Sequence, residues 1–225
     1  MKPLGNFKSY SIPSMTLGLM LAAFFILYGA RLSFAQNLKN CDLIFHAQGH
    51  GEFSNAISES TGAQDSVKFV HVGIIEVDKE RKPYVIEASP EEGVRTITLS
   101  EFLSQSPHQA GKPRVVIKRL SIPIDEEKII IRAKSFMGQP YDWWYLPDNE
   151  KLYCSELVQI CFIDSSGNNI FPTQPMNFRD KDGNIPSFWI DLFKELDMDV
   201  PEGIPGTNPN DLSKHPLLFE VFRYF

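Results

Sequence analysis

Three residue types in this chain could together perform nucleophilic chemistry: a cysteine, a histidine and a glutamate. Cys154 follows the polar turn "YLPDNEKLY" and begins an apolar helical pattern in which Leu157, Val158 and Cys161 share one face. The N–H groups and the positive dipole end of a helix N-terminus stabilise a thiolate, so this position favours a reactive cysteine. A packed structural thiol is the alternative, because free cysteines are among the most buried residues of proteins.

A thiol nucleophile needs a base within hydrogen-bonding reach and a third group that orients this base. The segment "VKFVHVGIIEVDKERKPYVIEASP" predicts a β-hairpin whose apolar strands flank a charged turn. With the turn centred on Lys79, His71 and Glu87 become cross-strand partners on one face. A carboxylate beside an imidazole raises the imidazole pKa and favours a thiolate–imidazolium pair. Each residue also has a plainer alternative: His71 as a half-buried strand histidine, and Glu87 as a solvated edge residue.

The remaining segments predict the elements that must position these side chains. Ser100 is expected to cap the helix within "GVRTITLSEFLSQ", and Gly138 to end the helix within "DEEKIIIRAKSFMGQ". Residues 46–52 are expected to form a loop, and residues 172–209 a long Pro- and Gly-rich segment containing the amphipathic stretch "PSFWIDLFKELDM". Further strands are expected at residues 41–45, 113–120 and 217–225, and further helices at 53–60 and 154–162. No repeat or linker divides the chain, which predicts one α+β domain.

Composition narrows the class of protein. The 225 residues are 43% apolar with a net charge of −6, typical of a globular protein. With 28 acidic against 22 basic residues and no long basic stripe, the chain lacks the charge pattern of a nucleic-acid binder.

Residues 1–35 have the pattern of a secretory signal peptide. Lys2 and Lys8 precede an apolar run over residues 17–28, and Ser33 and Ala35 are small residues before a cleavage site. A membrane anchor is the alternative, but the run is shorter than the ~20 residues that span a bilayer. We therefore expect cleavage after Ala35, a single domain over residues 36–225, no stable membrane span afterwards, and a secreted or periplasmic location in the cell envelope.

An exported chain with Cys41, Cys154 and Cys161 has an odd number of thiols in an oxidising compartment. Cys154 and Cys161 are too far apart along one helix to form a disulfide, so any bridge would involve Cys41, and none is expected.

The stretch "HAQGHGEFSNAI" carries two histidines that suggest a metal site. His46 and His50 are four residues apart, but the neighbouring glycines favour a loop, and no third ligand stands at useful spacing. We expect no metal and no cofactor, and interpret this stretch as a substrate-lining loop with Gln48 as a binding candidate.

The segments "FVHVGII", "YVIEA" and "GQPYDWWYLPDNEKLYCSELV" together resemble the permuted papain-like amidases of the YiiX-like group, relatives of NlpC-type cell-wall peptidases. The resemblance extends from "DLIF" to the C-terminal "VPEGIPGTNPNDLSKHPLLF" and implies a circularly permuted papain-like fold, with an antiparallel sheet packed against helices. In ordinary papain-like enzymes the cysteine precedes the histidine, whereas here His71 precedes Cys154, as a permutation of the same site would give.

The resemblance implies a role for four residues. Cys154 matches the family nucleophile, His71 its base and Glu87 the residue that orients the base. Tyr141, in "QPYD", matches a tyrosine that points its hydroxyl at the reaction centre, where the Cys154 N–H would be a second oxyanion donor. A core aromatic is the alternative for Tyr141.

The expected function is that of a secreted cysteine amidase or peptidase that hydrolyses an amide, such as a cell-wall peptide, through a thioester. Trp143, Trp144 and Tyr145 are candidates to line its cleft, or else pack on the core. The same kind of site resembles that of lecithin retinol acyltransferase, so a lipid amidase or acyltransferase is one alternative. A binding module of the cell envelope with an inert Cys154 is another.

Overall fold

The computed structural model describes residues 37–62 and 66–225. Leu38–Phe225 form one compact unit. The predicted signal peptide and its cleavage site lie outside the described residues. No helix within the described ranges has the length and hydropathy of a membrane span.

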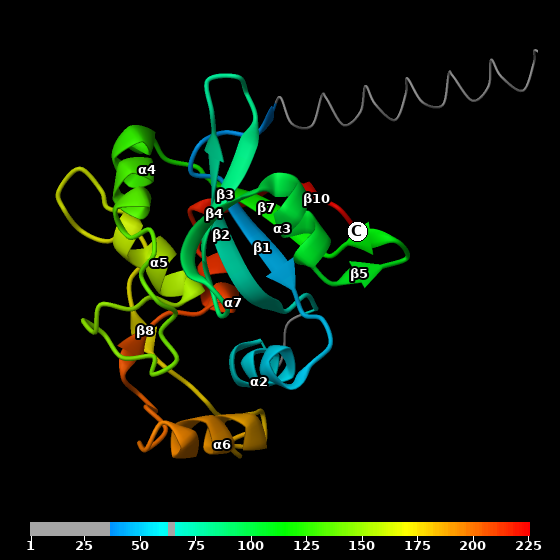
Figure 1. The fold of residues 1–225 in the computed structure, drawn as a ribbon, viewed down its shortest axis with the longest axis vertical. Coiled ribbons are helices and arrows are strands. Elements are labelled where there is room, and N and C mark those ends of the chain that lie inside the picture. Colours follow the sequence, from blue (N-terminus) through cyan, green and yellow to red (C-terminus); the bar gives the residue numbers. More distant parts are fainter. Residues whose placement is uncertain (1–36, 63–65) are drawn as a thin grey trace, which may run out of the picture. The chain divides into compact units, whose positions relative to one another are not determined.

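A six-stranded antiparallel sheet organises the chain (Figure 1). Its strands stand in the order β10-β7-β1-β2-β3-β4, so neighbours in space are often distant in sequence. Their bounds are β1 (Leu43–Ala47), β2 (Phe69–Val77), β3 (Pro83–Ser89), β4 (Gly93–Thr98), β7 (Val115–Leu120) and β10 (Leu218–Arg223). Two short ladders accompany the sheet: β5 (His108–Gln109) with β6 (Lys112–Pro113), and β8 (Gln174–Pro175) with β9 (Pro205–Gly206).

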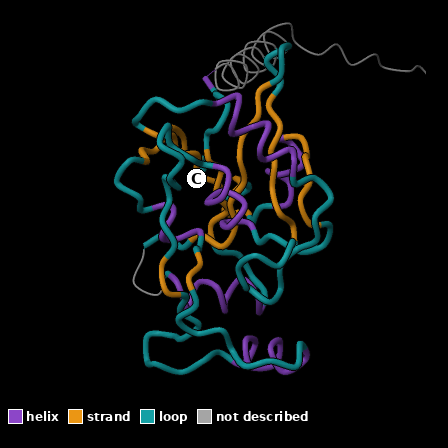
Figure 2. The backbone as a smooth tube through the Cα atoms, turned by 90° about the vertical axis from the view of Figure 1, so that its left-hand side faces the viewer, coloured by secondary structure: helices purple, strands orange, loops and turns teal. Residues whose placement is uncertain are grey.

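Helices pack against the sheet, as the predicted α+β class requires. They are α2 (Glu52–Thr61), α3 (Leu99–Gln105), α4 (Glu126–Ser135), α5 (Cys154–Cys161), α6 (Ser187–Glu195) and α7 (Pro209–Ser213). The helices α5 and α7 contact β2, whereas α3 contacts β3 and β4. Figure 2 shows α6 at the lower end of the molecule, apart from the strands of the main sheet.

The predicted hairpin is confirmed, but its expected register is wrong by two residues. Val77 pairs with Pro83, so the turn centres on residue 80 and not on Lys79. The ladder runs back through Ile74 opposite Ile86, which puts Gly73 in line with Glu87. A shift of two residues keeps every side chain on its face, because side chains in a strand alternate with a period of two.

Two other local expectations need correction. The N-cap of α3 is Thr98 and not Ser100: the Thr98 hydroxyl accepts from the Glu101 N–H at 3.2 Å, and Glu101 accepts from the Thr98 N–H at 2.8 Å. This reciprocal capping box satisfies two helix-end donors at once, which a cap at Ser100 would not. His46 lies in β1 and not in a loop, because the strand continues to Ala47 before Gly49 is reached.

Candidate active site

Cys154 is the first residue of α5. Its N-cap, Tyr153, has extended backbone angles and no side chain that caps the helix, so the first-turn N–H groups remain available to a ligand. Leu157, Val158 and Cys161 are buried on the predicted core face. Cys154 itself is 5% exposed and lines a cavity. Cys41, Cys154 and Cys161 are all free thiols.

His71 and Glu87 meet diagonally across the β2–β3 ladder. The His71 Nε2 and Glu87 Oε2 atoms are 2.6 Å apart. Gly73 lies next to this pair, and a Cβ at that position would clash with Val85 Cγ1 at 2.4 Å. The structure therefore brings the predicted pair together, although not as the directly opposed pair that was expected.

The pairing of β1 with β2 is irregular next to His71. His46 in β1 stands opposite His71, but the next residue, Ala47, stands opposite Phe69. Val70 is therefore an extra residue in β2, which is the definition of a β-bulge. Such bulges recur beside functional sites, where they redirect a side chain.

Arg95 also contacts Glu87, so that Arg95, Glu87 and His71 form a row of charged side chains. The sequence analysis did not predict that Arg95 belongs to this row. Arg95 stands opposite Glu87 in the β3–β4 ladder, and its Nε donates to Glu87 Oε1 at 2.9 Å. Both carboxylate oxygens of Glu87 are thus engaged, one by His71 and one by Arg95. A signal was present in the sequence, because "VRTIT" places an arginine in the strand that follows Glu87.

Electrostatics keep this row charged. Burial alone would lower the pKa of His71, but hydrogen bonds with Cys154 and Glu87 raise it to about 10. Burial would likewise raise the pKa of Glu87, yet the hydrogen bonds with His71 and Arg95 lower it to about 2. His71 is therefore an imidazolium near neutral pH, beside a carboxylate and in contact with Cys154.

His46 packs beside this row as a neutral ring. Its Nε2 is 3.0 Å from the Phe102 carbonyl oxygen, and its ring centroid is 5.4 Å from that of His71. Burial and the nearby His71 lower the pKa of His46 to about 3. A neutral ring there occupies space beside His71 without adding a competing positive charge.

Tyr141 is buried and lines two adjoining cavities. The outer cavity has a volume of about 440 Å³ and is lined by His71, Glu87 and Arg95 as well. The inner cavity has a volume of about 40 Å³ and is lined by Cys154. Burial, followed by the nearby Tyr145 and Cys154, raises the pKa of Tyr141, so its hydroxyl keeps its proton and can donate a hydrogen bond.

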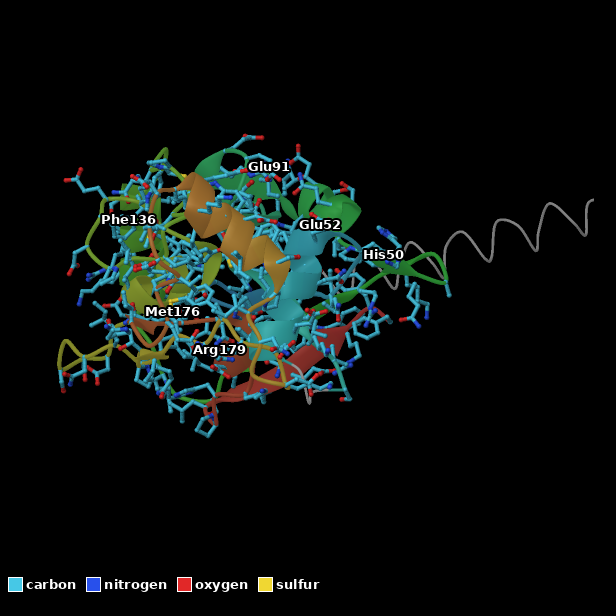
Figure 3. All side chains as sticks on the ribbon, turned by 90° about the horizontal axis from the view of Figure 1, so that it is seen from below. His50, Glu52, Glu91, Phe136, Met176 and Arg179 are labelled. Atoms are coloured by element: carbon cyan, nitrogen blue, oxygen red, sulfur yellow. The ribbon has the colours of Figure 1, made fainter. Side chains whose placement is uncertain are left out.

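The other residues expected at the site are placed differently. Gln48 lines a separate cavity together with His50, and its Nε2 donates to Asn55 Oδ1 at 3.1 Å. His50 lies on the far side of α2 from α6 (Figure 3). Trp143 packs on Phe53, with ring centroids 5.4 Å apart.

Of the aromatic cluster, Tyr145 lines the inner cavity, whereas the Trp144 ring is covered by the Lys151 ammonium at 3.4 Å. Tyr145 has a left-handed backbone conformation, with a φ of 53°.

The fold and this row of residues define a class: a papain-like fold in permuted order, with the histidine strand ahead of the cysteine helix. The chain belongs to the permuted papain-like amidase enzymes of the YaeF/YiiX, C92 family, which match residues 37–222. This membership supports an amidase or peptidase function.

Two relatives from Escherichia coli are similar to this chain. The uncharacterized protein YiiX of strain K12 is 24% identical over 194 residues, which cover 85% of this chain and 89% of YiiX. A crystal structure described as metalloprotein YiiX from strain O157:H7 has a TM-score of 0.68 at 21% identity, and covers 83% of this chain and 98% of that one. The similarity to this crystal structure confirms the predicted fold.

Metalloprotein is the description of that E. coli structure. The described residues of this chain do not fit a metal site. Within residues 37–62 and 66–225, no three His, Cys, Asp or Glu side chains are grouped so that they could hold a metal ion. His46, the histidine that packs beside His71, faces the Phe102 carbonyl through its Nε2, and its other neighbours are aromatic rings.

Proposed function

We propose that this protein is a cysteine amidase that cleaves a peptide-like amide through a thioester on Cys154. The observation that carries the proposal is the row formed by Arg95, Glu87 and His71, which ends at the Cys154 side chain. In this row Cys154 is the nucleophile, His71 the general acid and base, and Glu87 the residue that orients the imidazole.

The reaction proceeds in two halves. The Cys154 sulfur attacks the amide carbonyl carbon, while its proton resides on His71. The C–N bond then breaks as His71 gives this proton to the leaving amine, which leaves an acyl thioester. Water attacks the thioester and gives a proton to His71; the carboxylic acid departs, and the proton returns to the thiolate. The Tyr141 hydroxyl and the Cys154 backbone N–H donate to the oxyanion in both halves.

We propose a cell-wall peptide or a related amide as the substrate, encountered outside the cytoplasm. The support is the signal-peptide pattern of residues 1–35, together with the resemblance to cell-wall peptidases. The small inner cavity beside Cys154 favours an amide of modest size over a long lipid chain.

The test is site-resolved alkylation by iodoacetamide between pH 6 and 9, followed by mass spectrometry. We expect Cys154 to react at pH 7 roughly tenfold or more faster than a free peptide cysteine, because a free thiol is only a few per cent thiolate there. Cys41 and Cys161 are internal controls, since burial raises the pKa of both, that of Cys161 to about 12. His71→Ala should remove the advantage of Cys154.

A Cys154 that reacts like a free peptide cysteine, regardless of His71, would contradict the proposal. The chain would then be a binding module on a papain-like scaffold.

A further inference from the structure

The inner cavity beside Cys154 is lined by buried hydroxyl groups that lack hydrogen-bond partners. Tyr145 Oη, Ser155 Oγ and Thr207 Oγ1 are all buried without one, and all three residues line this cavity. The hydroxyls of Tyr141 and Tyr153 come near Tyr145 and Thr207, but without the geometry of a hydrogen bond. Buried polar groups in native proteins are nearly always paired, so three hydroxyls without a protein partner around one cavity point to a site that can bind a polar group.

The size of the cavity limits this group. A volume of about 40 Å³ accommodates a water molecule or a group of similar size, but not an alkyl chain. Its apolar walls include Ile57, Met176 and Trp189, which come from segments far apart in the chain, and the polar residues Ser60, Thr61, Asn177 and Asn208 also line it. Two of the walls, α2 and α6, are joined by a hydrogen bond, because the Trp189 indole N–H donates to Ser60 Oγ at 3.1 Å.

The helix that carries Trp189, α6, contributes one wall of this cavity. Figure 3 shows α6 running alongside α2, and the Phe53 and Phe188 rings join the two helices with centroids 5.4 Å apart. The inner cavity is therefore bordered by residues of α2, α6 and the loop around Met176.

The two cavities can be assigned to the two sides of the scissile amide. The acyl group stays on the Cys154 sulfur, and Cys154 lines the inner cavity but not the outer one. The amine receives its proton from His71, and His71 lines the outer cavity but not the inner one. On the proposed mechanism, the acyl side therefore enters the small cavity and the amine side occupies the large one.

We infer that the inner cavity is an acyl-group subsite that selects a short acyl group carrying a hydrogen-bonding atom close to the carbonyl, as in a small aminoacyl or hydroxyacyl group. This inference rests on the proposed cysteine mechanism and deepens it by naming the substrate class. The outer cavity, about ten times larger, accepts a bulkier amine.

The test uses p-nitrophenyl esters of three acids: glycolic, propionic and octanoic. Glycolyl and propionyl groups have nearly the same shape and differ by a hydroxyl in place of a methyl. Acylation of Cys154 is followed by intact mass and p-nitrophenolate release, with Cys154→Ala as the background. Each rate is divided by that of N-acetylcysteine with the same ester, which removes differences in intrinsic reactivity. We expect glycolyl to exceed propionyl by about tenfold or more, and octanoyl to be slower still.

Four variants locate the effect. Thr207→Val keeps the shape of the wall and removes one hydroxyl, so the preference for glycolyl over propionyl should fall severalfold, and Ser155→Ala should act in the same direction. Met176→Ala should raise the octanoyl rate by opening the cavity, whereas Met198→Ala, an equally half-buried methionine that does not line it, should not.

Equal normalised rates for glycolyl and propionyl would overturn the inference and assign the hydroxyls to a bound water only. An octanoyl rate as fast as the others would overturn it as well, while Cys154 would stand as the nucleophile. Absence of acylation by any ester, above the Cys154→Ala background, would overturn the proposed function and the inference with it.

Discussion

Glu87 is the residue on which the charged row depends, because it binds His71 with one oxygen and Arg95 with the other. Its 2% exposure leaves it almost no solvent to replace either partner. A buried carboxylate between two cations holds the imidazole in one orientation and in its charged form. Arg95 in turn acts through Glu87, as a positioning residue.

We predict that Glu87→Gln lowers the pKa of His71 from about 10 toward its ordinary value, because the charged acceptor is lost while the shape is kept. Amidase activity should fall by about 10²-fold or more, since the imidazole loses its orientation. The His71 titration is measured by NMR, and activity with any amide that the wild type cleaves. Glu92→Gln is the matched control: Glu92 binds the same Arg95 at 2.7 Å, but its side chain is 65% exposed.

An unchanged His71 titration in Glu87→Gln would contradict the role given to the carboxylate. A Glu92→Gln variant as impaired as Glu87→Gln would mean that Arg95, and not the carboxylate beside the imidazole, controls the site.

At the scale of elements, the caps and registers determine where the side chains point. We predict that Thr98→Ala lowers the free energy of unfolding by about 1 kcal/mol, because it removes the N-cap hydroxyl of α3. Ser100→Ala, at an exposed position two residues later in the same helix, should change it by a few tenths at most. Urea unfolding measures both. Equal losses in the two variants would show that the capping box contributes nothing.

The sequence predicted the type and place of most elements, because apolar periodicity reports which face is buried. It placed His71 and Glu87 on one face of a hairpin, and Cys154 at a helix start, and the structure has both features. His71 and Glu87 lie on one face despite the error of two residues in the predicted register, because side chains in a strand alternate with a period of two.

Other features needed contacts between segments far apart in the chain. The bulge at Val70 depends on how β1 meets β2, and no local pattern marks it. Arg95 reaches Glu87 only once β4 has paired with β3. Gln48 is predicted to lie in a substrate-lining loop, but β1 extends through Ala47 and Gln48 lines another cavity.

At the scale of the whole molecule, the C-terminal part of the chain holds the histidine strand in place. Asn210, in α7, is fully buried; its Oδ1 accepts from the Phe69 N–H at 2.7 Å and its Nδ2 donates to the Phe69 carbonyl at 2.8 Å. Phe69 begins the strand that carries His71, two residues later. The segment that follows the cysteine helix thus positions the base and also walls the inner cavity, so the site is a product of the complete unit.

Stability of the whole molecule should therefore depend on the protonation of buried groups. His71 has a folded pKa of about 10 against 6.5 in the unfolded chain, so its contribution is complete below pH 6.5 and is lost as the pH rises toward 10. Glu156 is a buried acid whose pKa is raised to about 8 by burial and by the nearby Asp142. Its contribution is complete below pH 4.5 and is lost as the pH rises toward 8.

We predict that these two windows can be separated by thermal unfolding at pH 4.5, 6.5, 8 and 10. Glu156→Gln mimics the protonated acid, so it should match the wild type at pH 4.5 and exceed it by pH 8, on the order of 2 kcal/mol. His71→Gln should be less stable than the wild type at pH 6.5, and this deficit should shrink by pH 10, where most of the stability contributed by the imidazolium is lost. A deficit that is constant with pH would mean that His71 contributes only packing. The ionic contacts between His71 and its charged neighbours would then not contribute to the stability of the protein.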